Sequence, residues 1–214
     1  MSLPSHAALM GSCLAGLAYS LTPGPGLLAL LGIGASQGRR AGAWFICGHL
    51  AGDIVWSSLA LAAIIGAQQI GAVVFDGLGL VCGAYIGWLG LRALLVRRRS
   101  ADAPLIVVRR PLLRGIAFGL TNPKGYPVAI ATFTALLAGE AGALSWASLP
   151  PLLAAAGIGF VIADLIMVVL TGAATTRRIY RRYEVWIVRL SGLMFLGFGA
   201  VTLHGAVTDL ARRE

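Results

Sequence analysis

The chain has 214 residues, of which 58% are hydrophobic and only 12% are charged, and its mean hydropathy is +0.85. So few charges could not cover the surface of a water-soluble domain of this length, which indicates an integral membrane protein. The chain carries 17 Lys and Arg against 8 Asp and Glu, but these basic residues lie in short segments between apolar runs without interleaved aromatic residues. They therefore predict membrane topology and no nucleic-acid partner.

The first apolar run, residues 6–31, is interrupted by the motif Pro23-Gly24-Pro25-Gly26. Proline lacks the backbone N–H and clashes with the carbonyl four residues before it, and glycine adds flexibility, so the motif predicts a broken helix. Lipid cannot hydrogen-bond the freed backbone groups, so non-helical backbone at that depth lies against protein or a water-filled cavity. Because transporters build their binding sites from such breaks, we expect these four residues to lie at a substrate site.

The second run, residues 41–65, contains the ionisable residues His49 and Asp53. Asp53 lies about 18 Å along the helix from the cytoplasmic end, near the bilayer centre. A charge there is costly unless it is paired or hydrated, so a functional role is expected. His49 is one helical turn from Asp53 and could relay protons to it, or it could be a hydrogen-bonded core residue.

The third run, residues 73–96, has glycines at four-residue spacing, Gly79, Gly83 and Gly87. Small residues at this spacing allow close contact between helices. The pattern fits packing within the chain and also fits a contact between two copies in a homodimer. A basic loop, residues 97–110, follows and divides the chain into halves of three runs.

The fourth run, residues 111–138, holds a second break at Asn122-Pro123-Lys124. A helix that restarts presents unpaired N–H groups and a partial positive charge, which attract a carboxylate, and Lys124 adds a full charge. Asp53 and Asp164, in the fifth run at residues 148–171, could receive an ammonium group or a proton. These charges fit a small zwitterionic substrate such as an amino acid. The structural alternative is a static ion pair among the three charged residues.

The sixth run covers residues 185–207, and the two halves of the chain are alike. Gly48 precedes Asp53 by five residues as Gly159 precedes Asp164, and the Gly83/Gly90 spacing recurs at Gly192/Gly199. Since each half has an odd number of spans, the second must be inverted relative to the first. The prediction is an all-α integral membrane protein of six transmembrane helices. It is one membrane domain, 1–214, that forms two inverted three-helix repeats, 1–96 and 111–210. The cytoplasmic loop 97–110 joins the repeats. The first and fourth helices are broken at mid-membrane.

The charged connections predict the orientation of the chain. Arginines lie in three alternate connections, after the first, third and fifth runs, whereas the other connections carry only Asp76 and Glu140. The positive-inside rule makes the basic connections cytoplasmic and places both termini outside. Residues 1–7 lack the basic segment of a cleavable signal peptide, so none is expected.

The two aspartates are expected to differ in their roles. A carboxylate close to Lys124 should stay ionised, while the other could take up and release a proton in each transport cycle. His49 offers Asp53 a route for protons, so Asp53 is the expected titrating partner.

Taken with their positions, Pro23-Gly24-Pro25, Gly48 to Asp53 and Asn122-Pro123-Lys124 resemble the lysine-exporter family of amino-acid translocators (LysE/RhtB). The resemblance covers nearly the whole chain. It implies export of amino acids or their derivatives across the bacterial inner membrane by proton antiport, with the residues of the two proline motifs at the site. One departure is Tyr126-Pro127, a second proline after the motif that would lengthen the break and bears on the substrate more than on the fold.

Other classes of function fit the sequence less well. A metal-ion exporter would need more ligands than Asp53, Asp164 and His49, and an intramembrane enzyme would need a nucleophile–base set. A scaffold without transport activity would leave the buried charges unexplained. Cys13, Cys47 and Cys82 are isolated from one another, so no zinc site, redox pair or cofactor is predicted. The expected partners are a zwitterionic substrate, protons and membrane lipid.

Overall fold

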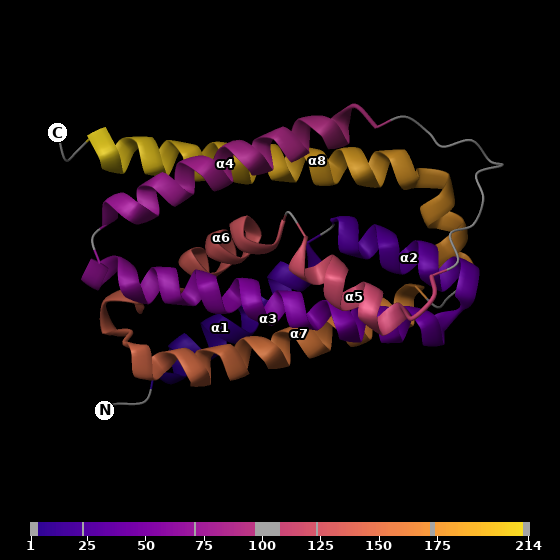
Figure 1. The fold of residues 1–214 in the computed structure, drawn as a ribbon, viewed down its shortest axis with the longest axis horizontal. Helices are drawn as coiled ribbons and strands as arrows, with labels where there is room; N and C mark the ends of the chain where they lie inside the picture. Colours follow the sequence, from indigo (N-terminus) through magenta and orange to yellow (C-terminus); the bar gives the residue numbers. More distant parts are fainter. Residues whose placement is uncertain are drawn as a thin grey trace.

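The computed structural model describes residues 4–22, 24–70, 72–96, 108–122, 124–171 and 174–211. Within these ranges the chain is helical, without strands (Figure 1). The elements are α1 (His6–Leu21), α2 (Pro25–Gln37), α3 (Arg39–Ile70), α4 (Ala72–Leu94), α5 (Pro111–Leu120), α6 (Gly125–Leu137), the 3-10 turns η1 (Ala141–Ala143) and η2 (Trp146–Ser148), α7 (Leu149–Thr171) and α8 (Ala174–Ala211).

Both predicted interruptions are present. The first run is divided into α1 and α2 and the fourth into α5 and α6. Pro25 occupies the first turn of α2, where its missing N–H removes no helical hydrogen bond. Pro23 and Pro123 lie outside the described residues, as does most of the predicted basic loop.

Within the described part of the chain, three helical segments are long and apolar enough to cross a membrane, by their length and composition. They lie within Arg39–Gly66, Trp146–Leu170 and Val185–Thr208. The helices α1, α5 and α6 are apolar but shorter, as expected for pieces of broken spans.

The last helix begins earlier than its apolar run. Residues 174–184, predicted as part of a basic connection, form the first turns of α8. The prediction was based on hydropathy, which marks only the apolar part of a helix. The segment from Ala174 to Ser191 contains neither glycine nor proline, so nothing in its local sequence ends the helix.

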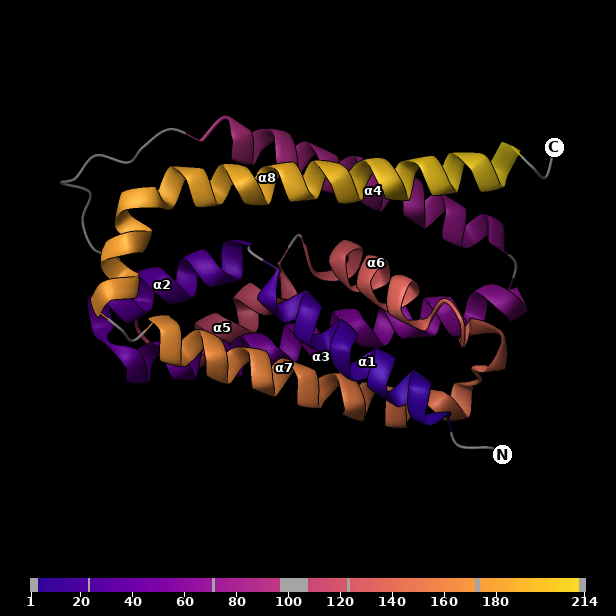
Figure 2. The same cartoon turned by 180° about the vertical axis from the view of Figure 1, so that it is seen from behind.

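Glycines hold α4 against α8, which run side by side in Figures 1 and 2. A Cβ atom on Gly90 would lie 2.7 Å from the carbonyl oxygen of Gly192, and one on Gly192 would lie 2.8 Å from that of Gly90. Gly83 and Gly199 are paired in the same way. The glycines that are seven residues apart in each half therefore face each other in one contact, between α4 and α8 of the same chain. Gly83 packs within the chain in this way.

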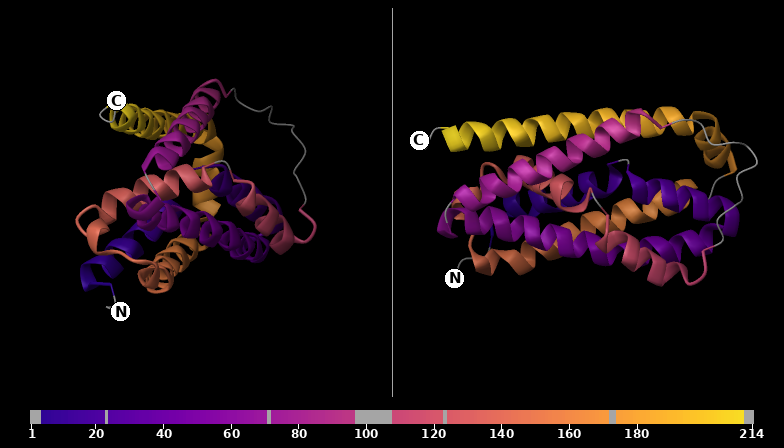
Figure 3. Two further views of the ribbon diagram at one scale, coloured as in Figure 1. Left: turned by 60° about the vertical axis from the view of Figure 1, so that its left-hand side comes forward. Right: turned by 45° about the horizontal axis from the view of Figure 1, so that its top comes forward.

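A second set of glycines packs the long helices against the first pieces of the broken ones. A side chain on Gly48 of α3 would collide with the backbone of α5 at Leu112. A side chain on Gly159 of α7 would collide with the backbone of α1 at Cys13. The helices α1, α3, α5 and α7 lie together, and the pair of α4 and α8 runs along one side of the molecule with α2 and α6 between (Figures 1 and 3).

Charged residues are segregated along the long axis of the molecule. The junction of α2 with α3 and the starts of α5 and α8 lie together at the right of Figure 1. Exposed arginines mark this end, among them Arg39, Arg109 and Arg178. The start of α1 and the end of α8 lie at the left, with the connection between α6 and α7, where Glu140 accepts a hydrogen bond from Ser5 Oγ at 2.6 Å.

Candidate functional site

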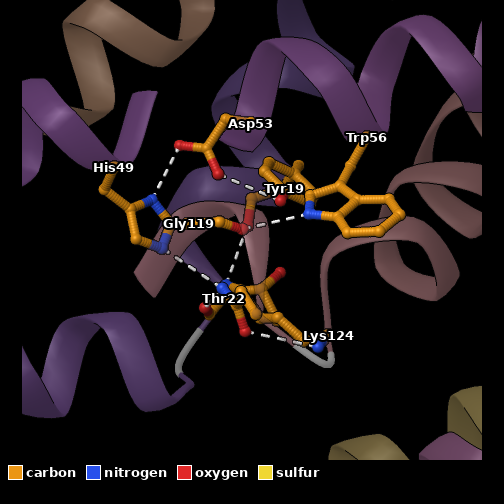
Figure 4. Close-up of polar contacts among 8 residues, drawn as sticks. Tyr19, Thr22, His49, Asp53, Trp56, Gly119 and Lys124 are labelled. Atoms are coloured by element: carbon orange, nitrogen blue, oxygen red, sulfur yellow. Dashed lines mark hydrogen bonds and ion pairs between the residues drawn. The ribbon is translucent and has the colours of Figure 1, made fainter. Parts of the chain in front are cut away.

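Lys124 joins the two helix breaks. It is only 4% exposed, and its Nζ donates hydrogen bonds to the carbonyl oxygens of Thr22, at 2.6 Å, and Tyr19, at 3.3 Å (Figure 4). These carbonyls end α1, where a cation offsets the partial negative charge of the helix. Among the described residues Lys124 makes no ion pair with a carboxylate, so the static ion pair considered as the structural alternative is absent there.

Glycines in both breaks permit close approach of side chains. A Cβ atom on Gly24 would lie 2.8 Å from Lys124 Cδ, and one on Gly26 would lie 2.9 Å from His49 Nε2. A Cβ on Gly125 would run into the ring of Trp56, whose Nε1 donates to the carbonyl of Gly119 at 3.0 Å. The breaks therefore need glycine to let the side chains of Lys124, His49 and Trp56 reach them.

His49 connects Asp53 to the second break. Its Nδ1 lies 3.1 Å from Asp53 Oδ2, and its Nε2 lies 3.2 Å from Asn122 Nδ2. Asn122 Oδ1 accepts the backbone N–H of Lys124 at 3.3 Å, so the amide nitrogen faces the histidine as a donor. Nε2 is then the acceptor, and the proton of the neutral ring lies on Nδ1 and is donated to Asp53.

Asp53 is 2% exposed and has a partner at each oxygen. Besides His49, the hydroxyl of Tyr19 donates to Oδ1 at 3.0 Å. Tyr19 was not predicted as a site residue, because an aromatic residue inside an apolar run is ordinary in a membrane helix. Its place four residues before Pro23 was the signal available in the sequence.

The two aspartates differ in their contacts. Asp164 is 8% exposed, and its Oδ1 has no hydrogen-bond partner within the described residues. Ser20 Oγ is buried and without a partner in the same way. Neither the free carboxylate oxygen of Asp164 nor the unpartnered hydroxyl of Ser20 could be read from the sequence.

A narrow cavity brings these groups together. In this conformation it has room for about one water molecule. It includes five predicted site residues, Gly26, His49, Asp53, Lys124 and Asp164. Two further predicted residues lie next to lining residues: Asn122 contacts His49, and Gly24 contacts Lys124. The side chain of Pro25 is not among those described. Among the described residues the lining is formed by Tyr19, Ser20, Gly26, Leu27, Ile46, His49, Asp53, Lys124, Asp164 and Met167.

The first turn of α2 also faces the cavity, through Gly26 and Leu27. Its N-cap residue, Gly24, provides no side-chain hydrogen bond to this turn. The first turn of a helix has backbone N–H groups without helical acceptors and a partial positive charge, and this turn lies at the cavity. Acidic side chains, a cation and a helix N-terminus thus meet at one buried place.

Comparison with known proteins agrees with this architecture. The model of the LysE type translocator family matches residues 17–205. The chemotactic transduction protein ChpE of Pseudomonas aeruginosa is 31% identical over 128 residues, which cover 55% of this chain and 59% of that protein. An uncharacterized membrane protein of the same organism is 25% identical over 199 residues, which cover 84% of this chain and 87% of that protein. No solved structure matches the chain.

The part of this chain that matches ChpE covers about three fifths of the length of ChpE. The family match extends much further, because its residues include both helix breaks and every residue that lines the cavity. This match, together with the apolar helices, shows that the chain belongs to the LysE type translocator family, a family of multi-pass membrane transporters.

Proposed function

We propose that the protein is a secondary active exporter of amino acids or related small metabolites, driven by proton antiport. The observation that carries the proposal is the buried cavity where the two helix breaks meet, which presents both Asp164 and the N-terminal turn of α2. A zwitterion carries an ammonium and a carboxylate on one carbon and needs both kinds of group. Buried carboxylates can also carry the protons whose gradient would drive export.

The proposed architecture has six spans in two inverted three-helix repeats, with α1–α2 and α5–α6 as the broken spans. The packing supports this proposal, because each helix contact made by the first half has a counterpart made by the second half. The second span, α3, packs on the first piece of the fourth through Gly48, and the fifth span, α7, packs on the first piece of the first through Gly159. The third and sixth spans, α4 and α8, pack on each other.

The proposed location is the bacterial inner membrane with both termini outside. The arginines at the end where α5 and α8 begin support this orientation (Figure 1). That end would face the cytoplasm. Because the cavity is now too small for an amino acid, transport would need the site to open toward one end and then the other, as inverted repeats allow.

Everted membrane vesicles test the proposed function. Vesicles that contain the protein should accumulate labelled amino acids when their interior is acidified, and an uncoupler should abolish the uptake. Vesicles made with Lys124→Ala in comparable amount serve as the control. Uptake of no amino acid, together with gradient-driven movement of a divalent metal ion, would contradict the proposal and favour a metal exporter.

A further inference from the structure

Asp164 is a buried carboxyl group with an oxygen that no protein group satisfies. Its exposed fraction is 8%, and Oδ1 lacks a hydrogen-bond partner within the described part of the chain. A buried carboxylate without a partner is costly, because nothing replaces the hydration that it loses. Asp164 therefore needs either a proton or a cationic ligand. Asp53 differs, because each of its oxygens already has a partner and a ligand would have to displace one.

A second unsatisfied oxygen lines the same cavity. Ser20 Oγ on α1 is buried, and within the described residues it has no hydrogen-bond partner. A primary ammonium group has three N–H donors and no acceptor. A carboxylate oxygen and a hydroxyl oxygen at one cavity fit such a group better than they fit an anion.

The remaining wall of the cavity is divided into two kinds of surface. Gly26 and Leu27 belong to the first turn of α2 and line one part of the wall. The free N–H groups of a helix's first turn can bind a carboxylate. Leu27, Ile46 and Met167 supply apolar side chains. Within the described lining there is no further unpartnered carboxylate for a cationic side chain. The wall thus fits a neutral amino acid with an apolar side chain.

We propose that a proton and the α-ammonium group of a neutral, apolar amino acid compete for the carboxylate of Asp164. Ser20 accepts a second hydrogen bond from the ammonium group, and the first turn of α2 receives the substrate carboxylate. The proposal rests on the proposed exporter function and assigns its coupling step. When the zwitterion binds to protonated Asp164, the O–H bond breaks and the proton leaves to solvent, so one proton is released for each amino acid bound.

Other ionisable groups face the same cavity and set the local field. Tyr19 comes from α1, His49 and Asp53 come from α3, and Lys124 comes from the second break. Each of these four has a hydrogen-bond partner in the structure. The sequence alone favoured Asp53 for the titrating role because of His49. The free oxygen of Asp164 is the observation that moves our proposal to the other aspartate.

The test measures binding and proton release together on the purified full-length protein in detergent. The probes are labelled L-alanine, L-valine, L-leucine, L-methionine and L-lysine. At least one apolar amino acid should bind more tightly than lysine. Its apparent Kd should rise about tenfold for each unit of falling pH where the carboxyl is protonated, because the two ligands compete by mass action. A pH-indicator dye should report about one proton released per amino acid bound.

Three substitutions assign the effect to the site. Asp164→Asn, which keeps the shape of the side chain, should weaken binding tenfold or more and abolish proton release, whereas Asp164→Glu should retain both. Ser20→Ala should weaken binding by a smaller factor. Ser57→Ala is the matched control, because Ser57 Oγ is also buried without a partner but does not line the cavity; it should bind as the wild type does.

The outcomes separate this inference from the proposed function. If Asp164→Asn binds the amino acid with unchanged affinity and proton release, Asp164 is not the shared site, and the exporter function still stands. Tighter binding of lysine than of any apolar amino acid would overturn the substrate class. Failure of every amino acid to bind the wild type at any pH would overturn both proposals.

Discussion

Lys124 fixes the geometry of the site through hydrogen bonds to backbone carbonyls, and its Nζ also lies 5.4 Å from the centroid of the Tyr19 ring. Its ammonium group holds two carbonyls at the end of α1, more than a hundred residues earlier in the chain. Its backbone N–H is bound by Asn122, which also donates to His49. One residue therefore links the end of the first broken helix to the hydrogen-bond chain of the second.

Replacement of Lys124 should remove the hydrogen bonds that join the second break to the end of α1. Lys124→Ala leaves the two carbonyls buried without a donor, so transport should fall to background, and the midpoint of thermal unfolding should fall as well. Lys124→Arg keeps the charge but is larger, and Gly24 already lies against Lys124 Cδ, so partial activity is expected. Wild-type transport by the alanine variant in proteoliposomes would remove Lys124 from the site.

The hydrogen-bond chain from Asn122 through His49 to Asp53 has a direction, which predicts an unusual rescue. Asp53→Asn would replace one of the two acceptor oxygens by an amide donor, which faces either the Nδ1–H of His49 or the hydroxyl of Tyr19, so the variant should lose at least tenfold in transport rate. The double variant Asp53→Asn/Asn122→Asp reverses the polarity at both ends of the ring and should recover part of that loss. A double-mutant cycle on transport rates measures the coupling, and strict additivity would show that the chain has no direction.

The sequence predicted some of these contacts and missed others for a physical reason. The four-residue spacing of His49 and Asp53 implies contact on one helix face, and the structure has it. The partners of Lys124 are backbone carbonyls distant in the chain, which leave no signature in residue type. Tyr19 and Ser20 are inconspicuous in an apolar run, so the sequence did not show that both line the cavity or that Tyr19 reaches Asp53 of α3.

The helices are held together by glycines at which one backbone touches another. Gly159 on α7 faces the backbone of α1, whereas Gly157 on the same helix has no atom near the position of a Cβ. This contrast offers a matched pair of substitutions that have the same chemistry and differ only in the space available.

Gly159→Ala should destabilise the protein because its methyl group must separate α7 from α1. Gly157→Ala should be neutral or should stabilise it by up to about 1 kcal/mol, since alanine favours the helix over glycine. Thermal unfolding of the two purified variants checks this prediction. Equal transition temperatures for both would show that the contact between α1 and α7 is looser than described here.

Hydropathy predicted the helices, and the proline and glycine motifs predicted their breaks, but neither predicted the helix ends well. Both interruptions were found because proline and glycine act locally on the backbone. The early start of α8 at Ala174 was missed because arginine and tyrosine form helix readily while lowering hydropathy. The pairing of α4 with α8 was likewise hidden, since glycine spacing does not name the partner helix.

The molecule as a whole has one strongly basic end, which makes its proposed orientation testable. Arg109 is exposed at that end, and Gly139 is exposed at the other. In a cysteine-free variant, Arg109→Cys should react with a membrane-impermeant maleimide only after spheroplasts are permeabilised. Gly139→Cys should react in intact spheroplasts. The reverse pattern would invert the proposed topology.

Coupled movement of amino acids and protons in proteoliposomes tests the central claim most directly. An amino-acid gradient imposed across the membrane, without any initial pH difference, should drive protons in the opposite direction at a fixed ratio. Asp164→Asn should abolish both fluxes, while Ser57→Ala should leave both intact. Amino-acid flux without proton movement in the wild type, or undiminished proton flux in Asp164→Asn, would contradict the account.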